Sequence, residues 1–233
     1  MTQLLVSVKN VDEALIALGA GANIIDIKDP SIGALGALDL SETKQIVRAI
    51  NSRVLVSATV GEQHRLVQVL ISDIQARIEL GVDIIKIEVS ELFYTVNFWD
   101  EIAKLTNVGV KVIAVFFAKV HLDFSLLETL EKAGFYGAML DTQTKQQNLL
   151  QVQTKHTLQM FTQNCRQYHL KSGLAGSLQP QHIASLTEFK PTYIGFRSGV
   201  CENLMRNSAL CEAKVMEVKS MLRQHNKLSG KAH

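Results

Sequence analysis

The sequence has 233 residues, of which 47% are hydrophobic and 20% are charged. These proportions are typical of one globular domain and argue against a disordered or a fibrous protein. Lysine and arginine number 24 and aspartate and glutamate 22, so the formal net charge is only +2, which argues against an extended surface for nucleic acid or for an anionic membrane.

Short apolar runs alternate with longer amphipathic stretches along the chain. The short runs are mostly continuous in aliphatic side chains, a pattern typical of strands that are covered on both faces. Eight such strands are predicted, over residues 4–8, 23–28, 53–60, 84–89, 111–118, 137–141, 171–176 and 193–198. The stretches between them show helical periodicity, as in the stripe formed by Val67, Leu70 and Ile74.

Several residues mark where the predicted helices begin and end. Gly21, Gly81 and Gly134 stand where three helices should stop, as glycines in the left-handed conformation often do. Ser41 is placed to cap the beginning of a helix that runs to about Ile50.

Eight strands, each followed by a helix, fit a single closed (β/α)8 barrel, which is an α/β fold. An open doubly wound sheet shows the same alternation and is the alternative. No linker, proline-rich stretch or block of charge divides the chain. We therefore predict one barrel domain over residues 1–226 and a frayed polar tail over residues 227–233.

The three cysteines, Cys165, Cys201 and Cys211, are an odd number, and none has the spacing of a metal-binding pair with another cysteine or a histidine. This predicts no disulfide framework, no metal site and a reducing, cytoplasmic compartment. The first residues lack the pattern of a secretory signal. The longest apolar stretch, residues 112–118, is far shorter than the roughly 20 residues that cross a membrane.

Charged residues interrupt three of the apolar strands near their carboxyl ends. Asp26 and Lys28 are two residues apart and therefore point to the same side of the second strand. Lys86 and Glu88 repeat this spacing on the fourth strand, and Asp141 ends the sixth. Because the active site of such a barrel lies at the carboxyl ends of its strands, these side chains are expected to meet at one rim.

Lysines and carboxylates gathered at one rim indicate carbonyl activation through an imine. An ordinary lysine, with a pKa of about 10.4, is almost entirely protonated at neutral pH, but a second ammonium or an apolar pocket frees the nucleophilic amine. Lys28 and Lys86 are placed to lower each other's pKa in this way, and Asp26, Glu88 or Asp141 could then transfer protons and orient the amines. The alternative is a set of structural ion pairs, which the number of charged residues makes less favoured.

Small residues follow the last two strands. The seventh strand ends in Gly176 and Ser177, and the eighth in Arg197, Ser198 and Gly199. Backbone N–H groups at such loops bind phosphate in many barrels of this class, and Arg197 could reach a second phosphate. The glycines could also be turn residues only, but the agreement of both loops favours a phosphate site.

With these motifs placed, the sequence resembles the (5-formylfuran-3-yl)methyl phosphate synthases of methanofuran biosynthesis. The similar blocks are LLVSV, GANIIDIKDPSIGALGA, VLVSATVG, DIIKIE, GAMLDTQTK, LAGSL and YIGFRSGVC, in this order from Leu4 to Cys201. The resemblance implies a barrel enzyme, a carbon–oxygen lyase that needs no cofactor. It would condense two glyceraldehyde 3-phosphate molecules into 4-(hydroxymethyl)-2-furancarboxaldehyde phosphate, with loss of phosphate and water.

By the family's pattern, Lys28 would form the imine and Lys86 would act in proton transfer, while Asp26, Asp141 and Lys145 match other residues of the barrel mouth. The sequence departs from the pattern at Glu88, where the family usually has glycine, and in the loops after the third and fifth strands, where proline- and glycine-rich segments are reduced or absent.

Two other functions are weighed against the synthase. One is a class I aldolase or isomerase that acts on another phosphosugar, and the other is a phosphate-ligand sensor without activity. The expected partners are small phosphorylated aldehydes, with neither nucleic acid nor membrane. The sequence leaves open a homo-oligomer and whether the product feeds methanofuran or a related one-carbon carrier.

Overall fold

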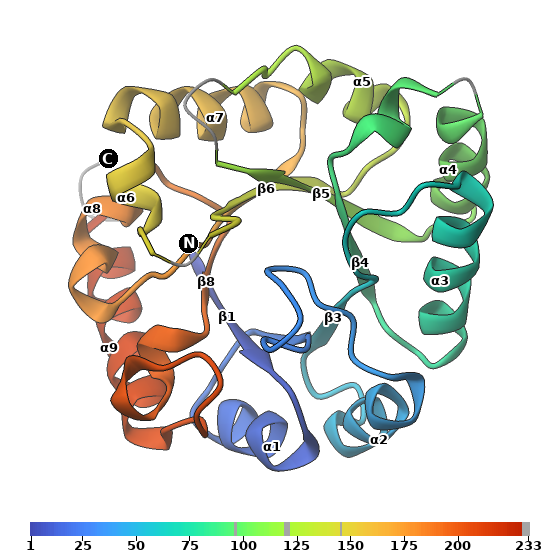
Figure 1. Cartoon of the computed structure of the whole chain (residues 1–233). Helices are drawn as coiled ribbons and strands as arrows, with labels where there is room; N and C mark the ends of the chain where they lie inside the picture. The colour runs from blue at the N-terminus through green and yellow to red at the C-terminus, as the bar shows by residue number, and fades with distance from the viewer. Residues whose placement is uncertain (96, 119–121, 145, 230–233) are drawn as a thin grey trace.

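Eight parallel strands close into a barrel, each hydrogen-bonded to the next in chain order and β8 to β1, and helices surround it (Figure 1). The computed structural model describes residues 1–95, 97–118, 122–144 and 146–229. The strands are β1 (Gln3–Val8), β2 (Ile24–Ile27), β3 (Leu55–Thr59), β4 (Ile84–Glu88), β5 (Lys111–Phe117), β6 (Gly137–Asp141), β7 (Lys171–Leu174) and β8 (Tyr193–Phe196). The predicted (β/α)8 barrel is confirmed, and the open sheet is excluded.

The helices alternate with the strands along the chain. They are α1 (Val11–Gly19), α2 (Leu40–Ile50), α3 (Val67–Glu79), α4 (Phe98–Thr106), α5 (Leu126–Lys132), α6 (Leu149–Val152), α7 (Lys155–Gln167), α8 (Ile183–Thr187) and α9 (Glu212–Ser229). Short 3-10 helices are η1 (Glu91–Tyr94), η2 (Pro180–His182), η3 (Ser198–Val200) and η4 (Glu202–Leu204). No helix in the described part of the chain is both long and apolar enough to cross a membrane.

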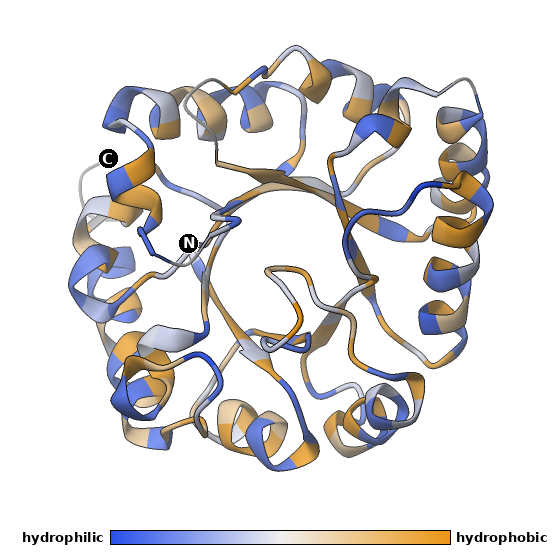
Figure 2. Ribbon diagram, in the orientation of Figure 1, coloured by the Kyte–Doolittle hydropathy of each residue, from blue (hydrophilic) through white to orange (hydrophobic). Residues whose placement is uncertain are grey.

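Two hydrophobic layers stabilise the barrel, because successive strand residues point to opposite faces. Ile25 and Ile27 face outward and pack in the layer between strands and helices. The inward residues form a smaller cluster that includes Ile24, Ile84 and Tyr193. In Figure 2 hydrophobic residues run along the barrel wall, while each surrounding helix carries both kinds of residue. This alternation puts Asp26 inside the barrel.

The helix ends confirm one prediction and correct another. Gly21, Gly81 and Gly134 have φ values of +88°, +92° and +74°, so all three end helices in the left-handed conformation. Ser41 does not cap α2, because the helix begins at Leu40 and its N-cap is Asp39, whose carboxylate accepts the Glu42 N–H at 2.9 Å. That hydrogen bond lowers the pKa of Asp39.

The last helix is longer than the sequence predicts. α9 continues through Ser229, so residues 227–229 of the predicted tail are helical. Lys227 stands in the last turn, where a cation interacts favourably with the negative end of the helix dipole. The other four residues of the predicted tail, 230–233, lie outside the described residues.

The barrel interior is packed tightly at one glycine. A Cβ atom added at Gly173 on β7 would lie 2.3 Å from the ring of Tyr193 on β8. Tyr193 is 2% exposed and is among the largest fully buried side chains. The absent side chain of Gly173 is therefore what makes room for the tyrosine ring inside the barrel.

Gly173→Ala should lower the free energy of unfolding by about 1–3 kcal/mol, because the added methyl overpacks the interior. Urea denaturation monitored by circular dichroism measures this loss. Gly19→Ala is the matched control, since nothing lies within 4 Å of a Cβ at that position. Equal stability of the two variants would show that the contact with Tyr193 does not constrain the barrel.

Candidate active site

A cavity of about 240 Å³ opens at the carboxyl ends of the strands. Its walls come from β1, β2, β6 and β8 and from the loops after β7 and β8. Seven residues of the predicted site line this cavity: Asp26, Lys28, Asp141, Gly176, Ser177, Arg197 and Ser198. The structure thus brings together residues that are up to 172 positions apart in the sequence (198 − 26).

The Asp26 carboxylate is the centre of a buried polar cluster. It is 0% exposed and accepts hydrogen bonds from the hydroxyls of Ser7, at 2.8 Å, and Ser57, at 2.7 Å. The Nζ atom of Lys86, itself 1% exposed, lies 2.6 Å from the same carboxylate. The register explains this cluster, because Ser7, Asp26 and Ser57 are direct partners on β1, β2 and β3.

Lys86 does not line the cavity with Lys28. The ion pair with Asp26 holds its ammonium inside the barrel, and it is Asp26 that reaches the cavity wall. A buried ion pair persists only when hydrogen bonds compensate the loss of water, and here Ser7 and Ser57 supply them. Lys86 is therefore connected to the cavity through Asp26.

Lys28 follows β2 and is 6% exposed. Its Nζ atom donates to the carbonyl of Ala34 at 3.3 Å. Ala34 and Leu35 are 2% and 1% exposed and belong to the interior cluster, so residues 29–36 turn inward over the barrel. Figure 1 shows this blue segment, between β2 and α2, projecting over the barrel opening. We call residues 29–36 the β2 loop.

Asp141 ends β6, and its carboxylate accepts the N–H of Thr142 at 2.7 Å. It is 2% exposed and lines the cavity. Lys145, the remaining predicted catalytic residue, lies outside the described residues. The catalytic roles assigned to these residues from the sequence stay predictions.

Glu88 does not join the other charged residues at the cavity. Its carboxylate accepts the N–H of Gln63 at 2.9 Å, in the loop after β3. It lines a separate hollow of about 540 Å³ between the loops after β3, β4 and β5, together with His64. The His64 imidazole is held 2.9 Å from the carboxylate of Asp73. The sequence spacing placed Glu88 on the correct strand, but at the wrong hollow.

The loops after β7 and β8 pack closely against each other. Gly176 has a φ of +116°, and a Cβ added at Gly199 would lie 2.2 Å from the carbonyl oxygen of Leu178. Within the described residues, no protein acceptor is recorded for the backbone N–H groups of Ser177, Ser198 and Gly199. These glycines permit the close approach that an anion-binding loop needs.

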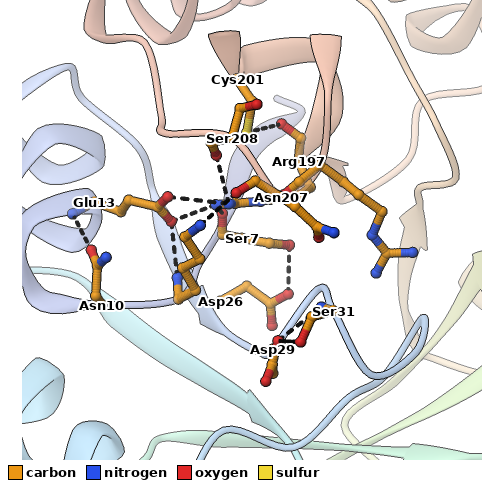
Figure 3. Close-up of polar contacts among 12 residues, drawn as sticks. Ser7, Asn10, Glu13, Asp26, Asp29, Ser31, Arg197, Cys201, Asn207 and Ser208 are labelled. Carbon is orange, nitrogen blue, oxygen red and sulfur yellow. Dashed lines mark hydrogen bonds and ion pairs between the residues drawn. The ribbon is translucent and has the colours of Figure 1, made fainter. Parts of the chain in front are cut away.

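Arg197 lines the cavity, but its guanidinium is engaged by other groups of the protein. Its guanidinium pairs with both oxygens of Glu13 on α1 and donates to the carbonyls of Ser7 and Ser208, each at 3.1 Å (Figure 3). The Nε atom donates to the carbonyl of Arg206 at 2.7 Å. All five N–H donors of an arginine are thereby used. The guanidinium is therefore held by protein groups and has no unused donor for a phosphate.

Arg206 is a residue at this cavity that the strand pattern did not mark, although Arg206 and Asn207 fit the pattern of the family that the sequence resembles. It lines the cavity and donates through Nη2 to the carbonyl of Gly33 in the β2 loop. Burial lowers the pKa of its guanidinium, while the charge of Asp141 opposes this shift. No periodicity or strand end marks position 206, since it lies in the irregular segment between η4 and α9.

A family model described as 4-HFC-P synthase matches residues 4–219. The chain belongs to this family. A protein of Methylorubrum extorquens, provisionally named a (5-formylfuran-3-yl)methyl phosphate synthase, is 38% identical over 95% of this chain and 92% of its own length. The (5-formylfuran-3-yl)methyl phosphate synthase of Methanocaldococcus jannaschii is 32% identical over 92% of this chain and 96% of its own.

Solved structures show the same fold. The 3-hexulose-6-phosphate synthase of Salmonella typhimurium superposes with a TM-score of 0.68 at 16% identity, covering 96% of this chain and 100% of that one. The phosphoribosyl anthranilate isomerase of Thermus thermophilus gives 0.66 at 11% identity, covering 96% and 99%. At these identities the likeness concerns the barrel alone.

Arg197→Met should lower the free energy of unfolding by about 3–5 kcal/mol, because it leaves the Glu13 carboxylate buried without its partner. Urea denaturation measures this effect. Lys104→Met is the control, since it breaks an exposed pair with Glu101 and should cost about 0–1 kcal/mol. A loss for Arg197→Met no larger than that of the control would contradict the structural role.

Proposed function

We propose that this protein condenses two molecules of glyceraldehyde 3-phosphate into 4-(hydroxymethyl)-2-furancarboxaldehyde phosphate through an imine on Lys28. One inorganic phosphate and two water molecules leave, which balances the reaction. Membership of the family supports the product class. The observation that carries the mechanism is the shielded Lys28 amine at the cavity, beside an aspartate that is paired with a second lysine.

Lys28 is the proposed nucleophile because it lines the cavity, whereas Lys86 does not line it and reaches it only through Asp26. Attack on an aldehyde needs the neutral form of the amine. The hydrogen bond from Lys28 Nζ to the Ala34 carbonyl orients the amine. Attack forms a carbinolamine, and loss of water then gives the imine.

Lys86 and Asp26 are the proposed proton-transfer pair. Removal of a proton from the carbon next to the imine gives an enamine, whose carbon attacks the second aldehyde. The Asp26 carboxylate, which reaches the cavity wall, can accept that proton, and the Lys86 ammonium, 2.6 Å away, stabilises the carboxylate and can return a proton in the later steps. The hydroxyls of Ser7 and Ser57 hold the carboxylate in place throughout. Asp141, on the cavity wall, is placed to assist the later loss of phosphate and water.

The loops after β7 and β8 supply the proposed phosphate site. Ser177 and Ser198 line the cavity that contains Lys28. Backbone N–H groups at such loops bind phosphate without a net charge of their own. A triose phosphate bound there would extend from these loops toward Lys28.

Borohydride treatment of the protein with glyceraldehyde 3-phosphate should leave a reduced adduct on Lys28, located by peptide mass spectrometry. Lys28→Met should remove the adduct and abolish formation of the furan, which absorbs in the near ultraviolet. Lys86→Met should slow furan formation by about 10²–10⁴-fold, the usual contribution of a general acid or base.

Lys132→Met is the control for these variants, because Lys132 is an exposed residue of α5 that pairs with Glu128. It should form both the adduct and the furan at the rate of the unchanged protein. An adduct on another lysine, or on none, would contradict the role of Lys28. A product without furan absorbance would instead indicate an aldolase acting through the same imine.

A further inference from the structure

A positive charge beside the backbone donors of the loops after β7 and β8 would strengthen the binding of a phosphate. Two arginines among the described residues line this cavity, Arg197 and Arg206. Every donor of the Arg197 guanidinium is used by Glu13 and by backbone carbonyls. The charge that faces a bound phosphate must therefore come from elsewhere.

Arg206 has the donors that Arg197 lacks. Within the part of the chain that the structure describes, its side chain has one recorded hydrogen bond, from Nη2 to the Gly33 carbonyl. Nε and Nη1 have no recorded partner there. An arginine offers five N–H donors in a planar fork that matches the oxygens of a phosphate.

Two structural contacts hold Arg206 at the cavity. Its backbone carbonyl accepts the Nε–H of Arg197 at 2.7 Å, so the Glu13–Arg197 pair fixes the segment from which it projects. Its side chain is anchored at the other end by Gly33 in the β2 loop. The adjacent residue, Ala34, accepts the hydrogen bond from Lys28. Arg206 and Lys28 thus contact neighbouring carbonyls of one loop.

The charges around Arg206 are mixed. Burial lowers the pKa of its guanidinium, whereas Asp141, Glu62 and Asp29 act in the opposite direction and Arg197 adds to the lowering. An arginine remains protonated under all such conditions at neutral pH. A phosphate that binds here would therefore meet a full positive charge in a half-buried setting.

We propose that Arg206 is the side-chain ligand of a substrate phosphate, completing the site that the loops after β7 and β8 form with their N–H groups. The assignment rests on the proposed function, in that the substrate is a phosphorylated aldehyde that reacts at Lys28. Arg197 is a positioning residue in this site, because it fixes the backbone of Arg206 without a donor of its own for the phosphate.

The test compares two aldehydes that differ only in the phosphate. Borohydride trapping on Lys28 is measured against the concentration of glyceraldehyde 3-phosphate and of unphosphorylated glyceraldehyde. Arg206→Met should raise the half-saturating concentration of the phosphorylated aldehyde about 10- to 100-fold. It should change that of glyceraldehyde by less than about threefold. Arg206→Lys keeps the charge but loses the planar set of N–H donors. Its half-saturating concentration for glyceraldehyde 3-phosphate should therefore lie between those of the unchanged protein and of Arg206→Met.

Arg223→Met on α9 is the matched control, an exposed arginine in a helix on the outside of the barrel, and should behave as the unchanged protein. An equal effect of Arg206→Met on both aldehydes, or no effect on either, would overturn the assignment. The effect on the phosphorylated aldehyde alone would support it, since a misfolded variant would lose trapping with both.

A direct titration separates this inference from the proposed function. Glycerol 3-phosphate has the phosphate but no carbonyl, so its binding, measured by isothermal calorimetry, needs no imine. If the unchanged protein forms no Lys28 adduct, the imine proposal fails. Weaker binding of glycerol 3-phosphate to Arg206→Met than to Arg223→Met would still support the role of Arg206, and equal binding would refute it.

Discussion

The carboxylate of Asp26 imposes the strongest physical constraint on this barrel. A charge with no exposed surface is costly unless other groups replace the water it loses, and Ser7, Ser57 and Lys86 do so from three different strands. These donors reach Asp26 only if β1, β2, β3 and β4 keep their register. The polar cluster and the arrangement of the strands therefore depend on each other.

A second buried ion pair lies at the barrel mouth. Glu13 on α1 binds the guanidinium of Arg197 at the end of β8, which joins the first and last units of the barrel. The two ion pairs hold Lys86 and Arg197 in place. Lys28 and Arg206 are the lysine and the other arginine that line the cavity among the described residues. Both contact the β2 loop, at Ala34 and Gly33.

The β2 loop packs into the barrel interior and also holds the Lys28 amine. Leu35 is buried among the aliphatic residues of the barrel interior, and its N–H donates to the Glu62 carboxylate. Thr59 on β3 donates to the carbonyl of Gly36 at 2.8 Å. Thr59 thus holds the β2 loop from β3, and the loop in turn holds the Lys28 amine through the carbonyl of Ala34. The position of the amine is therefore set before a substrate binds, as a preorganised site requires.

Local patterns in the sequence are enough to predict the barrel and most of the cavity wall. Period-two alternation within apolar strands is a local property, so it placed Asp26 and Lys86 inside the barrel and Ile25 outside. The glycines after β7 and β8 likewise predicted loops whose backbone can approach a ligand closely. The partner of Arg197 was decided by tertiary structure alone, because Glu13 lies 184 residues away on a helix whose periodicity carries no information about pairing. The direction of Glu88 and the presence of Arg206 at the cavity were decided in the same way, by how the closed barrel arranges its loops.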